Sequence, residues 1–254
     1  MFPLYNVDKR VIYALLIGLA IYSLVTMPGE QIAQLILTAP AVLIAITFHE
    51  FAHAKMADHF GDTTPRSQGR LTLNPLVHLD WFGTFLLFFA HIGWGKPVEI
   101  NSNNFNSNKS RGFCEAMVAL AGPLMNFLIA FITGLIYGYI YYFHGTEMVG
   151  TYLETVMDFL FILLSINIGL GVFNLIPLPP LDGEKIFKNV IPYRLKEWLD
   201  RYYYTLYVVF MILWFTGLLE IVVRPVINFF IFWLLKLVEQ IYKLIALLIL
   251  KIFG

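Results

Sequence analysis

Two histidines and a glutamate stand at a spacing that suits metal binding and proton transfer. His49 and His53 are four residues apart, and Glu50 directly follows the first of them. In a helix, residues four apart share one face, so both imidazoles can reach the same metal ion. Glu50 is rotated by about 100 degrees around the helix, where its carboxylate can take a proton from water beside that ion. These three residues therefore predict a metal site with an adjacent general base.

A catalytic zinc site needs a third protein ligand and one open position. Asp182 is the best candidate, because it lies near the end of a proline-rich stretch, residues 174–183. The prolines end a helix and favour extended backbone, and Gly183 permits a tight turn directly after the acid. A carboxylate returned in this way to a partly buried place is unfavourable unless a partner such as a metal ion is present. A solvated Asp-Gly turn is the alternative.

The elements that must position these residues are membrane helices. Of the 254 residues, 59% are hydrophobic and 13% are charged, whereas soluble domains have about half and about a quarter. The apolar residues form runs close to or above the roughly 20 residues that cross a bilayer as helix. These runs are residues 11–27, 31–48, 113–143, 151–176 and 202–223.

We therefore expect an all-α multi-pass membrane protein with a bundle of about six transmembrane helices, since helices satisfy their own backbone groups in lipid. We expect one domain over residues 1–254, with a catalytic core at residues 31–186 and C-terminal helices at residues 202–252. Its first partner is the lipid bilayer.

The charges predict the orientation of the chain. The formal net charge is zero, which argues against a nucleic-acid partner. Lys and Arg gather before the first run and in the connections at residues 66–70, 96–111 and 185–201. The connections at residues 28–30 and 144–150 have neither. By the positive-inside rule, the N-terminus, the basic connections and the opening of the site are expected in the cytosol.

Three other parts of the chain do not fit a simple transmembrane helix. Residues 81–94 are apolar but too few to cross twice, so we expect a re-entrant or interfacial segment. Residues 96–101 have the proline and the alternation of a small membrane-associated β strand or hairpin, with an interfacial loop as the alternative. In the last helix, Lys236, Glu239 and Lys243 share one face, which indicates mutual pairing or a helix lying in the interface.

The chain resembles the site-2 protease family of intramembrane zinc metalloproteases over most of residues 41–186. Residues 49–53 match the family's metal-binding helix, and residues 174–183 match its proline-rich segment ending in Leu-Asp-Gly. Three stretches between them are similar to the compact prokaryotic branch of the family, and these are residues 61–62, 69–75 and 121–126. That branch lacks PDZ or CBS domains.

The resemblance implies one zinc ion (Zn2+) per chain, bound by His49, His53 and Asp182, with Glu50 as the general base. It also implies that Asn174 stabilises the oxyanion of the tetrahedral intermediate, as a fixed donor can. A helix-terminal cap is the alternative for this residue, and Asn126 is expected near the site or in a packing role alone.

The implied substrate is a transmembrane protein, cut within or near its membrane segment in regulated intramembrane proteolysis. An edge strand at residues 96–101 would hold the unwound substrate by strand addition. The implied location is a plasma (inner) membrane. The sequence leaves open whether copies of the chain associate as a homo-oligomer.

Two other functions stay open on the sequence alone. A membrane-anchored zincin would cut soluble peptides, but such enzymes take their third ligand from a later glutamate, and no equivalent glutamate pair follows His53. A metal transporter or a non-catalytic metal-binding membrane protein could use the same ligands without needing Glu50. A Glu50→Gln variant, which removes the base and keeps the ligands, distinguishes these classes.

Overall fold

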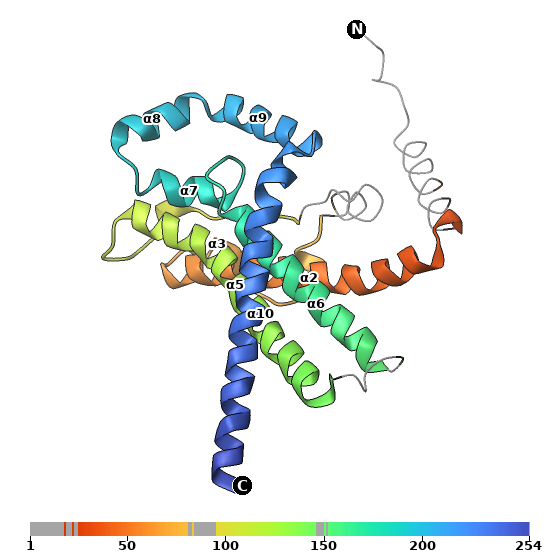
Figure 1. Cartoon of the computed structure of the whole chain (residues 1–254). Helices are drawn as coiled ribbons and strands as arrows, with labels where there is room; N and C mark the ends of the chain where they lie inside the picture. The colour runs from red at the N-terminus through yellow and green to blue at the C-terminus, as the bar shows by residue number, and fades with distance from the viewer. Residues whose placement is uncertain are drawn as a thin grey trace.

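The computed structural model describes residues 18, 22, 25–80, 83, 95–145, 150 and 152–253. Within these ranges the chain is mostly helical (Figure 1). The first expected span, residues 11–27, lies mostly outside the described residues, and so does the expected re-entrant segment at residues 81–94.

The long helices follow the apolar runs of the sequence. They are α2 (Gly29–His59), α5 (Arg111–His144), α6 (Tyr152–Asn174) and α10 (Leu218–Phe253). Each is long and apolar enough to cross a membrane, so the described residues hold four candidate spans. A helical multi-pass membrane protein is thereby confirmed, while the total of about six spans stays a prediction.

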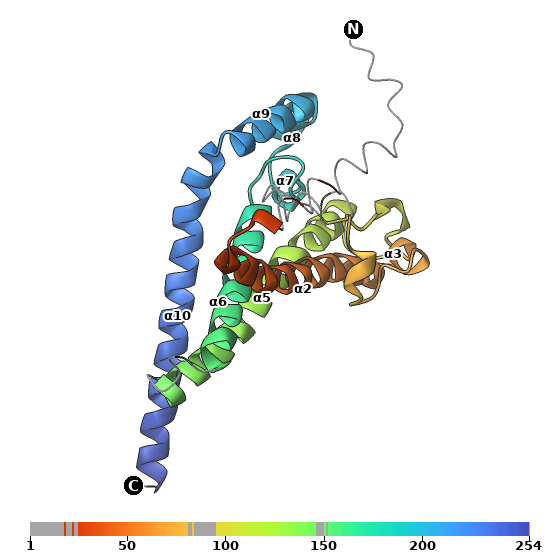
Figure 2. The same cartoon turned by 90° about the vertical axis from the view of Figure 1, so that its right-hand side faces the viewer.

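Shorter elements connect these spans. They are α3 (Thr64–Ser67), α7 (Asp182–Lys188), α8 (Tyr193–Arg201), α9 (Tyr203–Phe215) and two 3-10 turns, η2 (Pro75–Val77) and η3 (Ser102–Asn104). Figures 1 and 2 show α8 and α9 above α7 at one end of the molecule, while the C-terminal end of α10 projects at the other.

Helix α5 is the centre of the bundle. It packs extensively against α6 and α2, and α10 lies against both α5 and α6. The shared core consists of small and branched apolar side chains, and these are Ala130, Leu164, Ile168, Val172 and Val223. Small residues matter here because association of helices in lipid depends on close packing rather than on exclusion of water.

The contact between α5 and α10 is especially close at one glycine. A Cβ atom at Gly138 would overlap Cγ1 of Val238 and lie 3.1 Å from the ring of Tyr242. The Tyr242 hydroxyl donates a hydrogen bond of 2.8 Å to the carbonyl of Leu135, one turn before this glycine. The absence of a side chain at Gly138 therefore lets α10 approach α5.

The expectation that residues 202–223 form one span is wrong. Helix α9 ends at Phe215, and Gly217 adopts a left-handed φ of 74° before α10 begins. At this end of α9, both the amide and the hydroxyl of Thr216 donate to the carbonyl of Ile212. Since a span needs about 20 residues, the 13 residues of α9 are too few to cross.

Residues 96–101 are not a regular strand in the described part of the chain. An isolated antiparallel bridge joins Leu79 to Gly95, and the amide of Lys96 donates to the carbonyl of His78 over 2.9 Å. The expected β strand or hairpin is thus not confirmed. Individual hydrogen bonds, rather than a ladder, hold this segment.

The charges of the last helix have partners on α10 itself. Lys243 forms an ion pair with Glu239, and the ammonium of Lys236 lies 4.8 Å from the centre of the Trp233 ring. Of these three residues, Glu239 and Lys243 form the pair that the shared helix face indicates, whereas Lys236 lies over aromatic rings.

We predict that Gly138→Ala destabilises the protein and that Gly169→Ala does not. The first change overfills the interface between α5 and α10, at a cost of about 1–3 kcal/mol in the free energy of unfolding. Gly169 of α6 also faces α10, but its added Cβ would meet only Cδ1 of Ile227, at 3.7 Å. There, higher helix propensity should leave stability unchanged or raise it. Thermal unfolding in detergent measures both variants, and equal transition temperatures would contradict the close approach.

Candidate metal and catalytic site

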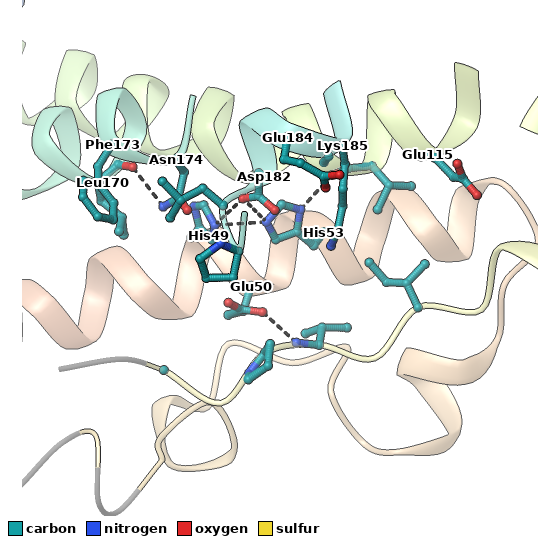
Figure 3. A pocket seen from close by; sticks show the side chains of 18 of the residues that line it. His49, Glu50, His53, Glu115, Leu170, Phe173, Asn174, Asp182, Glu184 and Lys185 are labelled. Carbon is teal, nitrogen blue, oxygen red and sulfur yellow. Dashed lines mark hydrogen bonds and ion pairs between the residues drawn. The ribbon is translucent and has the colours of Figure 1, made fainter. Parts of the chain in front are cut away.

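Three donor atoms from α2 and α7 meet in the structure (Figure 3). The Nε2 atoms of His49 and His53 lie 3.0 Å apart. Oδ2 of Asp182 lies 3.1 Å from the first of these nitrogens and 3.0 Å from the second. Among the described residues, these three form the group of His, Cys, Asp and Glu side chains that could share a metal ion. We refer to them as the donor cluster.

The geometry of the donor cluster fits zinc. Bonds of about 2.0–2.1 Å at tetrahedral angles put neighbouring ligand atoms about 3.3 Å apart. The three separations of 3.0–3.1 Å are close to this value. Two imidazoles and one carboxylate also leave a fourth corner free, which is the arrangement of catalytic rather than structural zinc sites.

Helix α5 fixes the orientation of both imidazoles. Nδ1 of His49 donates to Oδ1 of Asn126 over 2.6 Å, and Nδ1 of His53 donates to the carbonyl of Val118 over 2.7 Å. Because each Nδ1 donates to α5, the Nε2 atoms of both rings are directed at Asp182 and at the place that a metal ion would take. Such outer hydrogen bonds set the tautomer and raise the basicity of metal-binding histidines. Both rings are buried.

The space for the two rings comes from Gly122 of α5. A Cβ atom at this position would overlap Nε2 of His53 and lie 2.6 Å from Cε1 of His49. Any larger residue would therefore push the imidazoles away from Asp182.

Two buried asparagines extend the hydrogen bonds from the donor cluster into the bundle. Nδ2 of Asn126 donates to the carbonyl of Ala45 over 3.1 Å and to Oδ1 of Asn167 over 2.9 Å. Nδ2 of Asn167 in turn donates to the carbonyl of Leu163. Asn126 was expected near the site, whereas Asn167 was missed. Its signal is a polar side chain inside an apolar run, where lipid makes an unpartnered polar group costly.

Asp182 reaches the histidines because the chain turns back sharply after α6. Gly183 lies so close to this turn that its Cβ would overlap the backbone carbonyl oxygen of Ile176. Burial raises the pKa of the Asp182 carboxyl, but His53 and His49 beside it hold that pKa well below its usual range. The carboxylate is therefore the charged form that a metal ion needs.

Glu50 lies beside the donor cluster but points to a different partner. Its Oε2 atom accepts a hydrogen bond of 2.8 Å from the amide of Val98. Figure 3 shows its side chain directed from α2 toward this extended segment. Glu50 and the donor cluster line the same cavity, so a reactant there can meet both.

Asn174 makes the contact of a helix-terminal cap. Its Nδ2 atom donates to the carbonyl of Leu170, four residues earlier, over 3.0 Å. The residue also lines the cavity that contains the donor cluster. One amide hydrogen engages the helix, and the second is left for another acceptor.

The cavity has a volume of about 1180 Å³. It extends from α2 and the end of α6 to α7, α8 and the start of α9, and residues of the 95–105 segment form another wall. Small-molecule sites are commonly about 300–1,000 Å³, so this cavity has room for a longer ligand such as an extended peptide.

Comparison with known proteins agrees with the sequence pattern. The model of peptidase family M50 matches residues 143–216, which include Asn174 and Asp182. No solved structure matches the chain.

Three similar proteins have names that begin "Putative zinc metalloprotease". YwhC of Bacillus subtilis (strain 168) is 36% identical over 202 residues, covering 80% of this chain and 90% of that protein. MJ0611 of Methanocaldococcus jannaschii is 29% identical over 194 residues, or 73% of this chain and 87% of that protein. Rip2 of Mycolicibacterium smegmatis is 29% identical over 168 residues, or 61% and 58%. Because the match to YwhC covers most of both proteins, the chain belongs to peptidase family M50, the site-2 protease family of zinc metalloproteases.

Proposed function

We propose that the chain hydrolyses peptide bonds within or near transmembrane segments of other membrane proteins, with zinc held by His49, His53 and Asp182. The observation that carries this proposal is the convergence of three donor atoms at 3.0–3.1 Å, with both imidazoles oriented by α5. Glu50 next to them supplies the group that a transporter or a metal-binding protein without catalysis would not need.

In the proposed reaction, Glu50 transfers protons, while His49 and His53 hold the zinc ion. Zinc, when bound, polarises the scissile carbonyl and makes water a better nucleophile. Glu50 accepts the proton of the attacking water and returns it to the leaving amine as the C–N bond breaks. The buried rings of His49 and His53 keep their Nδ1 protons on α5 throughout, so their Nε2 atoms stay available.

Asn174 is proposed to stabilise the oxyanion that forms on the scissile carbonyl. One hydrogen of its side-chain amide is bonded to the Leu170 carbonyl, and this bond fixes the direction of the second hydrogen. A donor that is already fixed costs no reorganisation when charge develops, which is why such donors speed acyl transfer.

The substrate is proposed to lie extended along residues 97–101. Three of these residues line the cavity together with the donor cluster, and they are Pro97, Val98 and Ile100. A protease must hold its target unwound, and addition of a strand to an extended segment achieves this. The source of that strand is a membrane helix that unwinds locally.

The proposed setting is a multi-pass protein of the plasma (inner) membrane, one domain over residues 1–254 with the four described spans and the one predicted at residues 11–27. The N-terminus and the cavity opening face the cytosol. Lys185, Lys188 and Lys196 line the cavity, and positive residues favour that side. All three donors come from one chain, so a homo-oligomer is not required to complete the site.

The first test compares wild type with Asp182→Ala and Glu50→Gln. We expect about one zinc per wild-type chain by elemental mass spectrometry, and sharply weakened binding without the aspartate, because two imidazoles alone hold zinc poorly. Glu50→Gln should keep zinc and lose cleavage. The probe is a single-span reporter with an Asn-Pro pair in its transmembrane segment, in phosphatidylcholine and phosphatidylglycerol vesicles. Zinc binding indifferent to Asp182, or unchanged cleavage with Glu50→Gln, would contradict the proposal.

The second test changes no donor. Gly122→Ala should weaken zinc binding about tenfold or more, because supporting interactions around metal sites typically contribute 10- to 100-fold in affinity. Its control is Gly134→Ala on the same helix, whose added Cβ would meet Leu164 at 3.3 Å and no histidine. Competition with a chromogenic chelator measures both affinities. Equal affinity in the two variants would show that the ring positions tolerate the methyl group.

The third test separates the two roles of Asn174. If its amide stabilises the oxyanion, Asn174→Ala should lower kcat by about 10²–10³-fold, with zinc content unchanged. Asn189→Ala is the matched control, because that amide also donates to a carbonyl four residues earlier, that of Lys185, over 2.9 Å. A cap alone would make both variants lose stability to a similar extent and retain similar turnover of the reporter.

A further inference from the structure

Asp62 is a buried carboxylate that lies outside the donor cluster. It follows the end of α2 and is 0% exposed. Its Oδ1 atom accepts hydrogen bonds from the amide of Thr64 at 3.0 Å, the hydroxyl of Thr64 at 2.6 Å and Nδ2 of Asn104 at 2.9 Å. Its Oδ2 atom accepts one from the amide of Asn101 at 2.7 Å.

These four donors keep the buried group charged. Burial raises the pKa of the Asp62 carboxyl, but the hydrogen bonds from Thr64, Asn104 and Asn101 hold it below its ordinary value. A charged acceptor makes shorter and stronger hydrogen bonds than a neutral one. The bond to the Asn101 amide is therefore a firm attachment of the backbone at that point.

This attachment lies three residues from the partner of Glu50. The amide of Val98 donates to Glu50, and the amide of Asn101 donates to Asp62. Both acceptors belong to α2 or to the turn directly after it, so residues 98–101 are tied to the same helix at both ends. The segment that carries Val98 runs alongside α2 in Figure 3.

Other hydrogen bonds also hold this segment, among them one before Val98 and one at the protein surface. The guanidinium of Arg70 donates to the carbonyl of Lys96, and an exposed bond of 2.7 Å joins Gln68 to Glu99. Asp62 makes the buried attachment on the C-terminal side of Val98, at Asn101. Since an extended chain has two soft dihedrals per residue, fixing both sides limits where the Val98 amide can point.

We propose that Asp62 is a positioning residue for the general base: by fixing Asn101, it holds the Val98 amide where it orients the Glu50 carboxylate. This inference rests on the proposed function, because it requires Glu50 to act as the base. It goes beyond that function by giving catalysis a dependence on a carboxylate that touches neither zinc nor substrate. A purely structural role, in which Asp62 anchors the loop without affecting Glu50, is the alternative to be excluded.

The first experiment compares Asp62→Asn with Asp58→Asn. With asparagine at position 62, the acceptor oxygen can stay on Thr64 and Asn104, but the NH2 group then meets the Asn101 amide, donor against donor. Asp58 undergoes the same chemical change four residues earlier, where it pairs with Arg66. We expect Asp62→Asn to lower kcat by about tenfold or more, because a misplacement of about 1 Å can cost about a hundredfold. KM and zinc content should match those of Asp58→Asn, while the buried donor left unsatisfied should lower the thermal transition.

The second experiment asks whether Asp62 acts through Val98. Val98→Pro removes the amide hydrogen that Glu50 accepts, and Val98→Ala, which keeps it, gives the reference for the lost side chain. If both residues act through one hydrogen bond, the double variant Asp62→Asn/Val98→Pro should be no slower than the slower single variant. Independent effects would multiply, as they do for sites that are not coupled.

The outcomes separate this proposal from the function on which it rests. If wild type fails to cut the reporter, or Glu50→Gln cuts it as wild type does, the proposed function is wrong. If those two behave as expected, the Asp62 proposal is overturned by any of three results: kcat equal to that of Asp58→Asn, loss of zinc in step with the rate, or multiplicative effects. Should Asp62→Asn not fold, equal kcat for Val98→Pro and Val98→Ala overturns it as well.

Discussion

One face of α5 seats both imidazoles of the donor cluster, and the rest of the site depends on this contact. Val118, Gly122 and Asn126 are spaced by four residues and therefore lie on one side of the helix. The first and last accept the Nδ1 protons of His53 and His49, and the glycine between them leaves room for the rings. An unpaired imidazole N–H in this interior would be costly. The two hydrogen bonds therefore fix ring orientation and helix register together.

The same requirement to satisfy polar groups ties the site to the bundle. Asn126 is bonded to α2 through the Ala45 carbonyl and to α6 through Asn167, so one side chain connects three helices. Helix α6 then ends, and the turn that follows brings Asp182 back to the histidines. The donor cluster thus lies where hydrogen bonds join α2, α5 and α6, and a shift of any of these helices would separate the donors.

Parts of this arrangement are local in sequence, and these were predictable. The spacing of His49 and His53 follows from helix periodicity, and the expectation of membrane helices with family M50 membership is confirmed. The roles of His49, Glu50, His53, Asp182 and Asn174 stay predictions that the proposed experiments test.

Other parts depend on contacts between residues far apart in the chain. Asn126 is 77 residues from the histidine it orients, and no spacing rule links Asp62 to Asn101 or Val98 to Glu50. The break at Gly217 was missed because a glycine in an apolar run is also compatible with a continuous helix. The bend appears only in its positive φ. The alternation of apolar and polar residues at 96–101 predicted a strand. A strand also needs a neighbouring partner, which local sequence does not specify.

The length of α2 relates the site to the thickness of the membrane. His49 comes 20 residues after Gly29, the first residue of the helix. At about 1.5 Å per residue this is about 30 Å, which is also the thickness of a bilayer's hydrocarbon layer. If α2 starts at one surface and runs along the bilayer normal, the donor cluster lies at or just inside the opposite boundary, and tilt of the helix would place it deeper. Lipid with longer acyl chains would draw the cluster deeper into hydrocarbon, and shorter chains would bring it toward water. The hydration of a hydrolytic site would then vary with the lipids around it.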